Sequence, residues 1–196
     1  MTSSIIVHGG AGSHQVDQNK EVLNEAARAG GSVLESGGSA LDAVEDAVNV
    51  LEEHPDFNAG KGAKLQLDGV IRLEASIMTS DLEVGAVTGL QEIENAVSVA
   101  RQVMERTHHS MLGNGFATRF ATKCGFERSD LKTRQAVEQY QEVKDEISDL
   151  DFDETLEALR NRDTNGTVGC VAAKPNGELA AATSTGGRTW QLAGGI

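Results

Sequence analysis

The residues best placed to do chemistry form the run Asn165-Gly166-Thr167-Val168-Gly169, where a threonine follows a glycine and an acidic stretch. A threonine hydroxyl is a weak nucleophile unless a base lies beside it. An N-terminal threonine carries its own base, because its free α-amine has a pKa of about 8. Cleavage of the Gly166–Thr167 bond would free that amine, and glycine tolerates the strained backbone that such self-cleavage needs. The alternative is that the run only begins a strand, where β-branched residues are common.

A second group of hydroxyls lies in Thr183-Ser184-Thr185-Gly186-Gly187. This run ends the segment that we expect to pair with the Thr167 segment. Its hydroxyls could orient a nucleophile, and its glycines would let a ligand approach the backbone closely. A polar strand end followed by a glycine turn is the structural alternative.

Two further loops could serve such a site. Phe57-Asn58-Ala59-Gly60-Lys61-Gly62 offers Asn58, whose amide could donate a hydrogen bond to a developing oxyanion; otherwise it is a helix-to-strand loop. His8-Gly9-Gly10-Ala11-Gly12 lacks the full pattern of a phosphate loop. An esterase oxyanion loop would need a Gly-x-Ser-x-Gly elbow, which is absent. We therefore interpret it as a turn that brings backbone close to a site.

The remaining candidates are weak. His108-His109 has no third ligand at zinc spacing, and His14 and His54 are isolated. The acidic pairs Glu52-Glu53 and Asp145-Glu146 are typical of solvated faces.

The elements that must position these residues follow from apolar spacing. Helices are expected over residues 19–34, 39–51 (with Ser39 as N-cap), 93–106, 114–123 and 133–144. Strands are expected at residues 3–7 and 84–87, with hairpins over 64–78, around Asp68-Gly69, and over 167–185. Residues 145–163 are acidic and predict a mobile, solvated connector, with helix at 155–160. This order favours one α/β domain over residues 1–196, with helices packed on antiparallel sheets.

The composition narrows the class of protein. The net charge of −13 disfavours nucleic acid and anionic lipid as partners, and no apolar run is long enough to span a bilayer. The N-terminus shows no basic and apolar secretion signal. Two cysteines, Cys124 and Cys170, make no disulfide framework, so we expect free thiols and a cytoplasmic protein.

Taken together and in this order, the motifs resemble the plant-type asparaginases, which are also isoaspartyl peptidases and belong to the N-terminal-nucleophile hydrolases. The matching stretches extend over nearly the whole chain: His8–Gly12, Pro55–Gly62, Glu74–Met78, Gly85–Val87, Gly166–Val171 and Ala180–Gly187. The resemblance implies an αββα sandwich and a precursor that cuts itself between Gly166 and Thr167. Residues 1–166 would then form an α-subunit-like part, and residues 167–196 would begin a β-subunit-like part. Homodimers of processed precursors are expected if the fold is complete.

The resemblance also implies the roles of single residues. Thr167 would be the nucleophile, Thr185 its supporting hydroxyl and Asn58 the oxyanion donor, with Gly186 and Gly187 at the substrate. No cofactor is required. A structural sodium ion is expected, held by backbone carbonyls of six residues. These are Leu51, Glu52, His54, Phe57, Ala59 and Lys61.

Some positions depart from the family pattern. Glu74, Thr79 and Ser80 stand where the family has Asp, Asp and Gly. Gly195 stands where an arginine holds the α-carboxylate of the substrate, and the aspartate that holds the α-amine would follow residue 196. Two functions are therefore expected: hydrolysis of asparagine or isoaspartyl peptides, or a truncated, inactive homologue that acts as a binding or assembly partner. A serine esterase is disfavoured, because the elbow is absent and the last histidine is His109.

Overall fold

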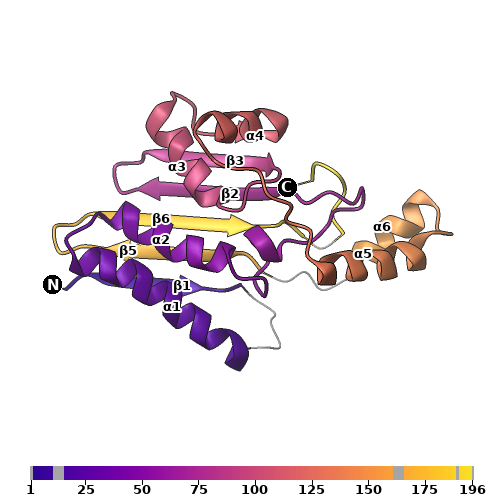
Figure 1. The fold of residues 1–196 in the computed structure, drawn as a ribbon, viewed down its shortest axis with the longest axis horizontal. Coiled ribbons are helices and arrows are strands. Elements are labelled where there is room, and N and C mark those ends of the chain that lie inside the picture. The colour runs from indigo at the N-terminus through magenta and orange to yellow at the C-terminus, as the bar shows by residue number, and fades with distance from the viewer. Residues whose placement is uncertain (1, 11–15, 161–165, 189, 196) are drawn as a thin grey trace.

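One mixed sheet organises the part of the chain that the computed structural model describes, residues 2–10, 16–160, 166–188 and 190–195. Six strands lie in the order β1-β5-β6-β2-β3-β4 (Figure 1). All neighbouring pairs are antiparallel except β3 and β4, which are parallel. The strands are β1 (Ser4–His8), β2 (Leu73–Thr79), β3 (Val84–Leu90), β4 (Leu112–Gly113), β5 (Val168–Ala173) and β6 (Leu179–Thr185). The helices are α1 (Val16–Glu35), α2 (Ala40–Glu52), η1 (Gly60–Gly62), α3 (Ala96–Arg106), α4 (Asn114–Lys123), α5 (Arg134–Ile147) and α6 (Phe152–Arg160).

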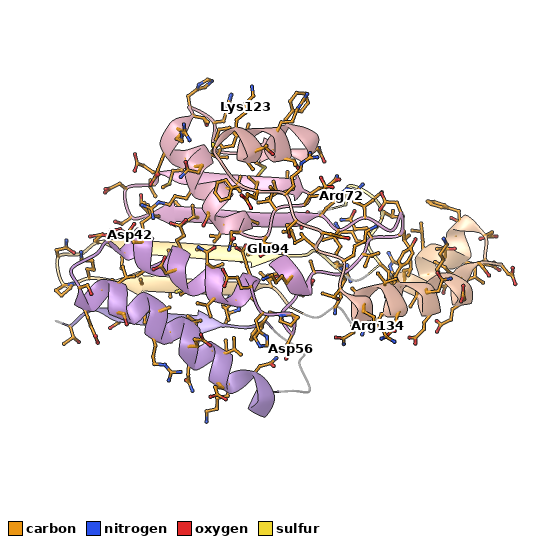
Figure 2. The ribbon with its side chains drawn as sticks, in the orientation of Figure 1. Asp42, Asp56, Arg72, Glu94, Lys123 and Arg134 are labelled. Atoms are coloured by element: carbon orange, nitrogen blue, oxygen red, sulfur yellow. The ribbon has the colours of Figure 1, made fainter. Side chains whose placement is uncertain are left out.

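Helices α1, α2 and α3 cover one face of the sheet (Figure 1). Helix α2 lies over β5 and β6, and α3 lies over β2 and β3. The side chains between these two layers are buried and form one apolar cluster. Arg101 of α3 ties the two central helices together, because its guanidinium lies 2.7 Å from Asp42 and 2.5 Å from Glu45 of α2 (Asp42 is labelled in Figure 2). The helical layer therefore fixes the positions of the strands beneath it.

The opposite face of the sheet is apolar and exposed at one end. Cross-strand partners point to the same side of a sheet, and one row of partners runs across four strands on this face. That row is Ile6, Val171, Ala181 and Met78. Ile6 is 68% exposed, Val171 49% and Met78 39%. We call this row, with Leu179 beside it, the bare face.

Local sequence chemistry explains several element boundaries. Ser39 caps α2 as expected: its hydroxyl accepts from the Asp42 N–H, and the Asp42 carboxylate accepts from the Ser39 N–H. Gly30 lies inside α1, where its lack of a side chain has a use. A Cβ there would lie 2.4 Å from the Ala43 carbonyl oxygen, so glycine lets α1 and α2 approach closely.

Most expected elements are present, and the hairpin over 167–185 is confirmed as β5 and β6. The prediction of a hairpin over residues 64–78 was wrong. Asp68-Gly69 does form a turn, with Gly69 at a φ of +74°, but residues 64–67 form no strand. Leu65 and Gln66 are instead buried in irregular chain, and β2 takes β3 and β6 as its neighbours. The turn signal was local, whereas strand pairing depends on the whole sheet.

The acidic connector contains more helix than expected. Helix α5 continues to Ile147, and α6 extends over Phe152–Arg160, where the Asp151 and Glu154 side chains cap its first turn. No residue of α6 is buried, so its solvated character is confirmed. The α5–α6 pair stands apart from the layers as a charged arm (Figures 1 and 2). Tyr140 anchors this arm: its ring stacks on Trp190 and its hydroxyl donates to the Leu67 carbonyl.

None of the helices within the described residues is long and apolar enough to cross a membrane.

Candidate active site

The candidate nucleophile lies at the polar end of the face that the helices leave uncovered. Thr167 is exposed and directly precedes β5, whose first residue, Val168, pairs with Ser184 of β6. Thr185 follows Ser184, so it lies one strand away from Thr167. Glu74 of β2 pairs with Thr185. A row of two hydroxyls and a carboxyl therefore crosses three adjacent strands at this end of the sheet.

The His8-Gly9-Gly10 segment presses against the bond that the sequence predicts to be cut. Gly10 has a φ of +98°, and a Cβ there would lie 2.5 Å from the Gly166 Cα and 3.2 Å from the Thr167 carbonyl oxygen. Only glycine fits this contact. The interpretation of the loop as a close backbone approach is therefore confirmed for the described residues, while Ala11 and Gly12 lie outside them.

Asn58 clamps the glycines that follow β6. Its side-chain Nδ2 donates to the Gly187 carbonyl at 2.6 Å, and its backbone carbonyl accepts from the Gly186 N–H at 2.9 Å. A Cβ at Gly186 would lie 2.6 Å from Asn58 Oδ1. The Gly187 N–H donates to Thr185 Oγ1 at 3.1 Å. The structure thus brings Asn58 together with Thr185, Gly186 and Gly187.

Beneath this row lies a buried polar contact. Ser184 points to the helical side of the sheet, and its hydroxyl donates to Glu52 Oε1 at 2.5 Å. The Val97 N–H, in the first turn of α3, donates to the same oxygen at 3.1 Å. Burial raises the pKa of Glu52 to about 8, against the opposing effect of these hydrogen bonds.

Glu74 sits opposite a β-bulge. The register between β2 and β3 shifts around it, and Gly89 of β3 has a φ of +61°. Bulges often re-aim a side chain beside a functional site. Burial raises the pKa of Glu74 to about 7, although the Gly89 N–H and the positive charge of Arg72 oppose the rise. A carboxyl that titrates near neutral pH is placed beside Thr185.

The loop after α2 gathers backbone carbonyls. A Cβ at Gly60 would lie 2.2 Å from the Glu52 oxygen, and one at Gly62 would lie 1.9 Å from the Phe57 oxygen. These glycines leave room for carbonyls that turn into the loop. Four of the six carbonyls predicted to hold sodium also accept backbone hydrogen bonds. They belong to Leu51, His54, Phe57 and Ala59.

The other candidates stay apart from this site. The rings of His108 and His109 contact each other at a tilt of 44° after an exposed helix end, with 4.0 Å between their centroids. His14 lies outside the described residues. Among the residues that the structure describes, no three His, Cys, Asp or Glu side chains are grouped to hold a metal. Lys61 pairs through its side chain with Glu94, at 3.2 Å (Glu94 is labelled in Figure 2). Both cysteines are free.

The interpretation of Glu52-Glu53 as a solvated face was wrong for Glu52, which is 0% exposed, and sequence reasoning missed the contact of Glu52 with Ser184. Two signals pointed to it. Glu52 continues the buried helix positions Val44 and Val48 at intervals of four, and strand alternation turns Ser184 away from Thr183 and Thr185. A polar side chain at a core position needs a partner. Glu52 and Ser184 each therefore needed a buried hydrogen-bond partner, and each could supply one to the other.

Comparison with known proteins agrees with this geometry. The chain is 41% identical over 199 residues to a plant-type L-asparaginase of Pyrococcus abyssi, with 94% of this chain and 63% of the relative aligned. It is 38% identical over 197 residues to an isoaspartyl peptidase/L-asparaginase of Rattus norvegicus, with 98% and 58% aligned. It is 39% identical over 202 residues to the protein of that name from Bos taurus, with 100% and 64% aligned. The chain thus spans about three fifths of the length of these relatives. The sequence model described as Asparaginase matches residues 1–196, and the chain belongs to this family.

Proposed function

We propose that this chain carries the nucleophile-bearing part of an amidohydrolase that acts on L-asparagine, on isoaspartyl peptides or on both. One observation supports this most strongly. The exposed Thr167 follows Gly166, which lies against Gly10. Thr167 also lies one strand away from Thr185, and Asn58 holds the two glycines that follow Thr185. Family membership supplies the substrate class, because the relatives are named for these two activities.

The proposed chemistry has two stages. First, hydrolysis of the Gly166–Thr167 bond consumes one water and leaves a carboxylate on Gly166 and a free amine on Thr167. In the second stage that amine takes the hydroxyl proton of Thr167, and Oγ1 attacks the side-chain amide carbon of asparagine or the β-peptide carbon of an isoaspartyl dipeptide. Ammonia or an amino acid leaves, and water then releases aspartate from the ester.

Asn58 would stabilise the charge that develops in this second stage. Its amide nitrogen is a neutral hydrogen-bond donor, and its contact with the Gly187 carbonyl at 2.6 Å holds it beside the glycines that follow Thr185. Loss of one oxyanion donor typically costs about 100- to 1000-fold in rate. The Gly186–Gly187 backbone, which bears no side chain, would lie against the substrate.

A sodium ion is proposed for the loop that carries Asn58. Hard cations accept cages of backbone carbonyls, and the close approach of the Glu52 and Phe57 oxygens to Gly60 and Gly62 fits such a cage. The ion would hold the loop in shape and take no part in the reaction.

The complete fold is proposed to be an αββα sandwich. The bare face supports this, since it is an apolar sheet surface with no layer over it within the described residues. A second sheet would pack there face to face, about 10 Å away. The sandwich would form a single domain, cut before Thr167 and assembled into homodimers.

The charge and the free thiols support a proposal for the partners of the protein and for its compartment. The net charge of −13 supports a small-molecule substrate and no nucleic-acid partner. The two free cysteines support a reducing compartment such as the cytoplasm.

A second candidate function is an inactive assembly or binding partner. The position of Gly195 favours it, because the family places there an arginine that clamps the α-carboxylate, and glycine offers no charge. We expect residues 1–196 alone to turn over little or no asparagine.

The test compares two proteins: residues 1–196, and an extended chain that carries Gly195→Arg and in which the unmatched segment of the Pyrococcus abyssi relative follows residue 196. Ammonia release from asparagine and aspartate release from an isoaspartyl dipeptide are measured for both. Turnover on the order of 1 per second in the extended chain, absent from its Thr167→Ala variant, is the expected result. Equal turnover in that variant would overturn the assignment of the nucleophile, and an inactive extended chain that melts cooperatively would favour the second function.

A further inference from the structure

The carboxyl group of Glu52 lies directly beneath the strand that carries Thr185, and the proposed chemistry makes no use of it. Glu52 is the last residue of α2 and is 0% exposed. Its Oε1 accepts two hydrogen bonds, from the Ser184 hydroxyl at 2.5 Å and from the Val97 N–H at 3.1 Å. Its Oε2 is buried and has no hydrogen-bond partner among the described residues.

A carboxyl is a costly choice at this place. Its neighbours on α2, Val48 and Leu51, are 0% exposed and apolar. An apolar side chain of similar volume would fill the same space without desolvating a polar group. The first turn of α3 offsets part of the cost, because helix N-termini favour acceptors. Packing alone does not account for the carboxyl.

The contact joins three elements at the level of the candidate site. Ser184 lies between Thr183 and Thr185 and pairs with Val168, which follows Thr167. Thr183, on the other face of the sheet, donates its hydroxyl to the Val168 carbonyl at 3.0 Å. Strand β6 is therefore tied at one face to β5, and at the other face to the end of α2 and the start of α3.

The same end of α2 leads into the loop that holds the glycines. Asn58 lies six residues after Glu52, and its backbone and side chain both bond to Gly186 and Gly187. The segment from Ser184 to Gly187 is thus held at both ends by one stretch of chain, through a carboxyl at its start and an amide at its finish.

We propose that Glu52 is a positioning residue for the threonine chemistry, acting through Ser184. The hydrogen bond fixes the depth and register of β6, so that the Thr185 hydroxyl and the Gly186–Gly187 backbone face Thr167. This inference rests on the proposed function. It requires an acceptor at residue 52 and a donor at residue 184, and no charge transfer between them.

The first test measures the rate of cleavage before Thr167, and kcat and KM, in the extended chain. Glu52→Leu and Ser184→Ala should each lower the cleavage rate and kcat by roughly 10- to 100-fold, since small misplacements cost that much. KM should change less than about threefold. Glu52→Gln keeps the acceptor and should restore most of the rate, and Glu52→Leu/Ser184→Ala should be no slower than the slower single variant.

The matched control is Ser98→Ala. Asn49 Nδ2 donates to Ser98 Oγ at 3.0 Å, so this variant also removes a polar contact between α2 and α3, but away from β6. It should lower the melting temperature and leave the cleavage rate unchanged. Wild-type rates in Glu52→Leu and Ser184→Ala, measured well below their melting temperatures, would overturn the proposal while leaving the proposed function intact.

A second test is independent of activity. Amide hydrogen exchange is measured for residues 1–196 and for the same variants. Glu52→Leu and Ser184→Ala should speed exchange at the Gly186 and Gly187 amides by at least about tenfold relative to Ser98→Ala, because β6 loses its anchor. Unchanged exchange at those two amides would overturn the positioning role even if the chain never cleaves. Failure of the proposed function would appear separately, as an extended chain that neither cleaves before Thr167 nor hydrolyses asparagine.

Discussion

At the scale of single residues, Thr185 and Thr167 are expected to act as a pair. Thr185 Oγ1 accepts the Gly187 N–H, which holds the hydroxyl at the end of β6. Thr185→Val keeps the volume of the side chain and removes that hydroxyl. We expect cleavage before Thr167 to slow by at least about tenfold, with a loss of stability near 1 kcal/mol, the usual value of one hydrogen bond.

Cleavage of the extended chain followed on gels, with melting curves beside it, checks this prediction. Thr79→Val, at the other end of the same sheet, should leave the cleavage rate alone. A large drop in melting temperature with unchanged cleavage would make Thr185 a structural residue.

Glu74 makes the stability of the chain depend on pH. Its pKa in the folded chain is about 7, above the value of 4.5 for an unburied carboxyl. Between these values the folded state holds a proton that the unfolded state has lost, so stability is full below about pH 4.5 and declines as pH rises toward 7. Glu74→Gln removes the titrating group.

The advantage of Glu74→Gln over wild type should therefore grow between pH 5 and pH 8. Melting temperatures of residues 1–196 across that range check it, with Glu83→Gln, at the exposed end of the β2–β3 hairpin, as the control. An advantage that stays constant with pH would contradict the account of Glu74.

At the scale of elements, the turn after β1 shapes the backbone at the predicted cleavage bond. Gly10 and Gly37 both have positive φ, +98° and +86°, but only Gly10 lies against another segment. Alanine at either position is strained, by roughly 1 kcal/mol. Gly10→Ala should in addition displace Gly166 and slow cleavage, whereas Gly37→Ala should lose stability only. Cleavage rates of the two variants, measured at matched stability, test this difference. Equal rates would mean that the turn at Gly10 does not shape the backbone at the cleavage bond.

Local chemistry explains which elements could be predicted from the sequence. The Ser39 capping box, the β5–β6 hairpin and the acidic α6 depend on neighbours along the chain, so their signals are visible in it. The false hairpin at Asp68-Gly69 carried the same kind of signal. Residues 64–67 cannot pair with β2, because β3 and β6 already flank β2 on both sides. This pairing is visible only in the assembled sheet.

The candidate site divides in the same way. Thr167, Thr185 and Asn58 could be named as candidates from the sequence, because their motifs are compact and resemble those of a family. The Glu52–Ser184 contact joins residues 132 positions apart, and the Gly10–Gly166 contact joins β1 to the start of β5. In each contact the two residues belong to different motifs, so their spacing in the sequence could not predict that they meet.

At the scale of the whole molecule, the bare face is an apolar surface that no layer covers within the described residues. Covering a large apolar side chain contributes about 1.5–3 kcal/mol. Val171→Lys should therefore cost little in residues 1–196, where the position is 49% exposed. In the extended chain it should cost more than about 3 kcal/mol, because a second sheet would bury the charge.

Denaturant unfolding of both proteins checks this difference, with Phe116→Lys on α4, where the side chain is 71% exposed, as the control. An equal, small effect of Val171→Lys in both proteins would mean that no second layer covers this face.

We expect Thr167 to become an N-terminal nucleophile, and the intact mass and N-terminal sequence of the purified extended chain show whether it does. We predict two fragments, the second beginning at Thr167, and a single uncut species for Thr167→Ala. Cleavage at another bond, or cleavage before residue 167 in the alanine variant, would contradict it. So would a wild-type extended chain that melts cooperatively and stays whole.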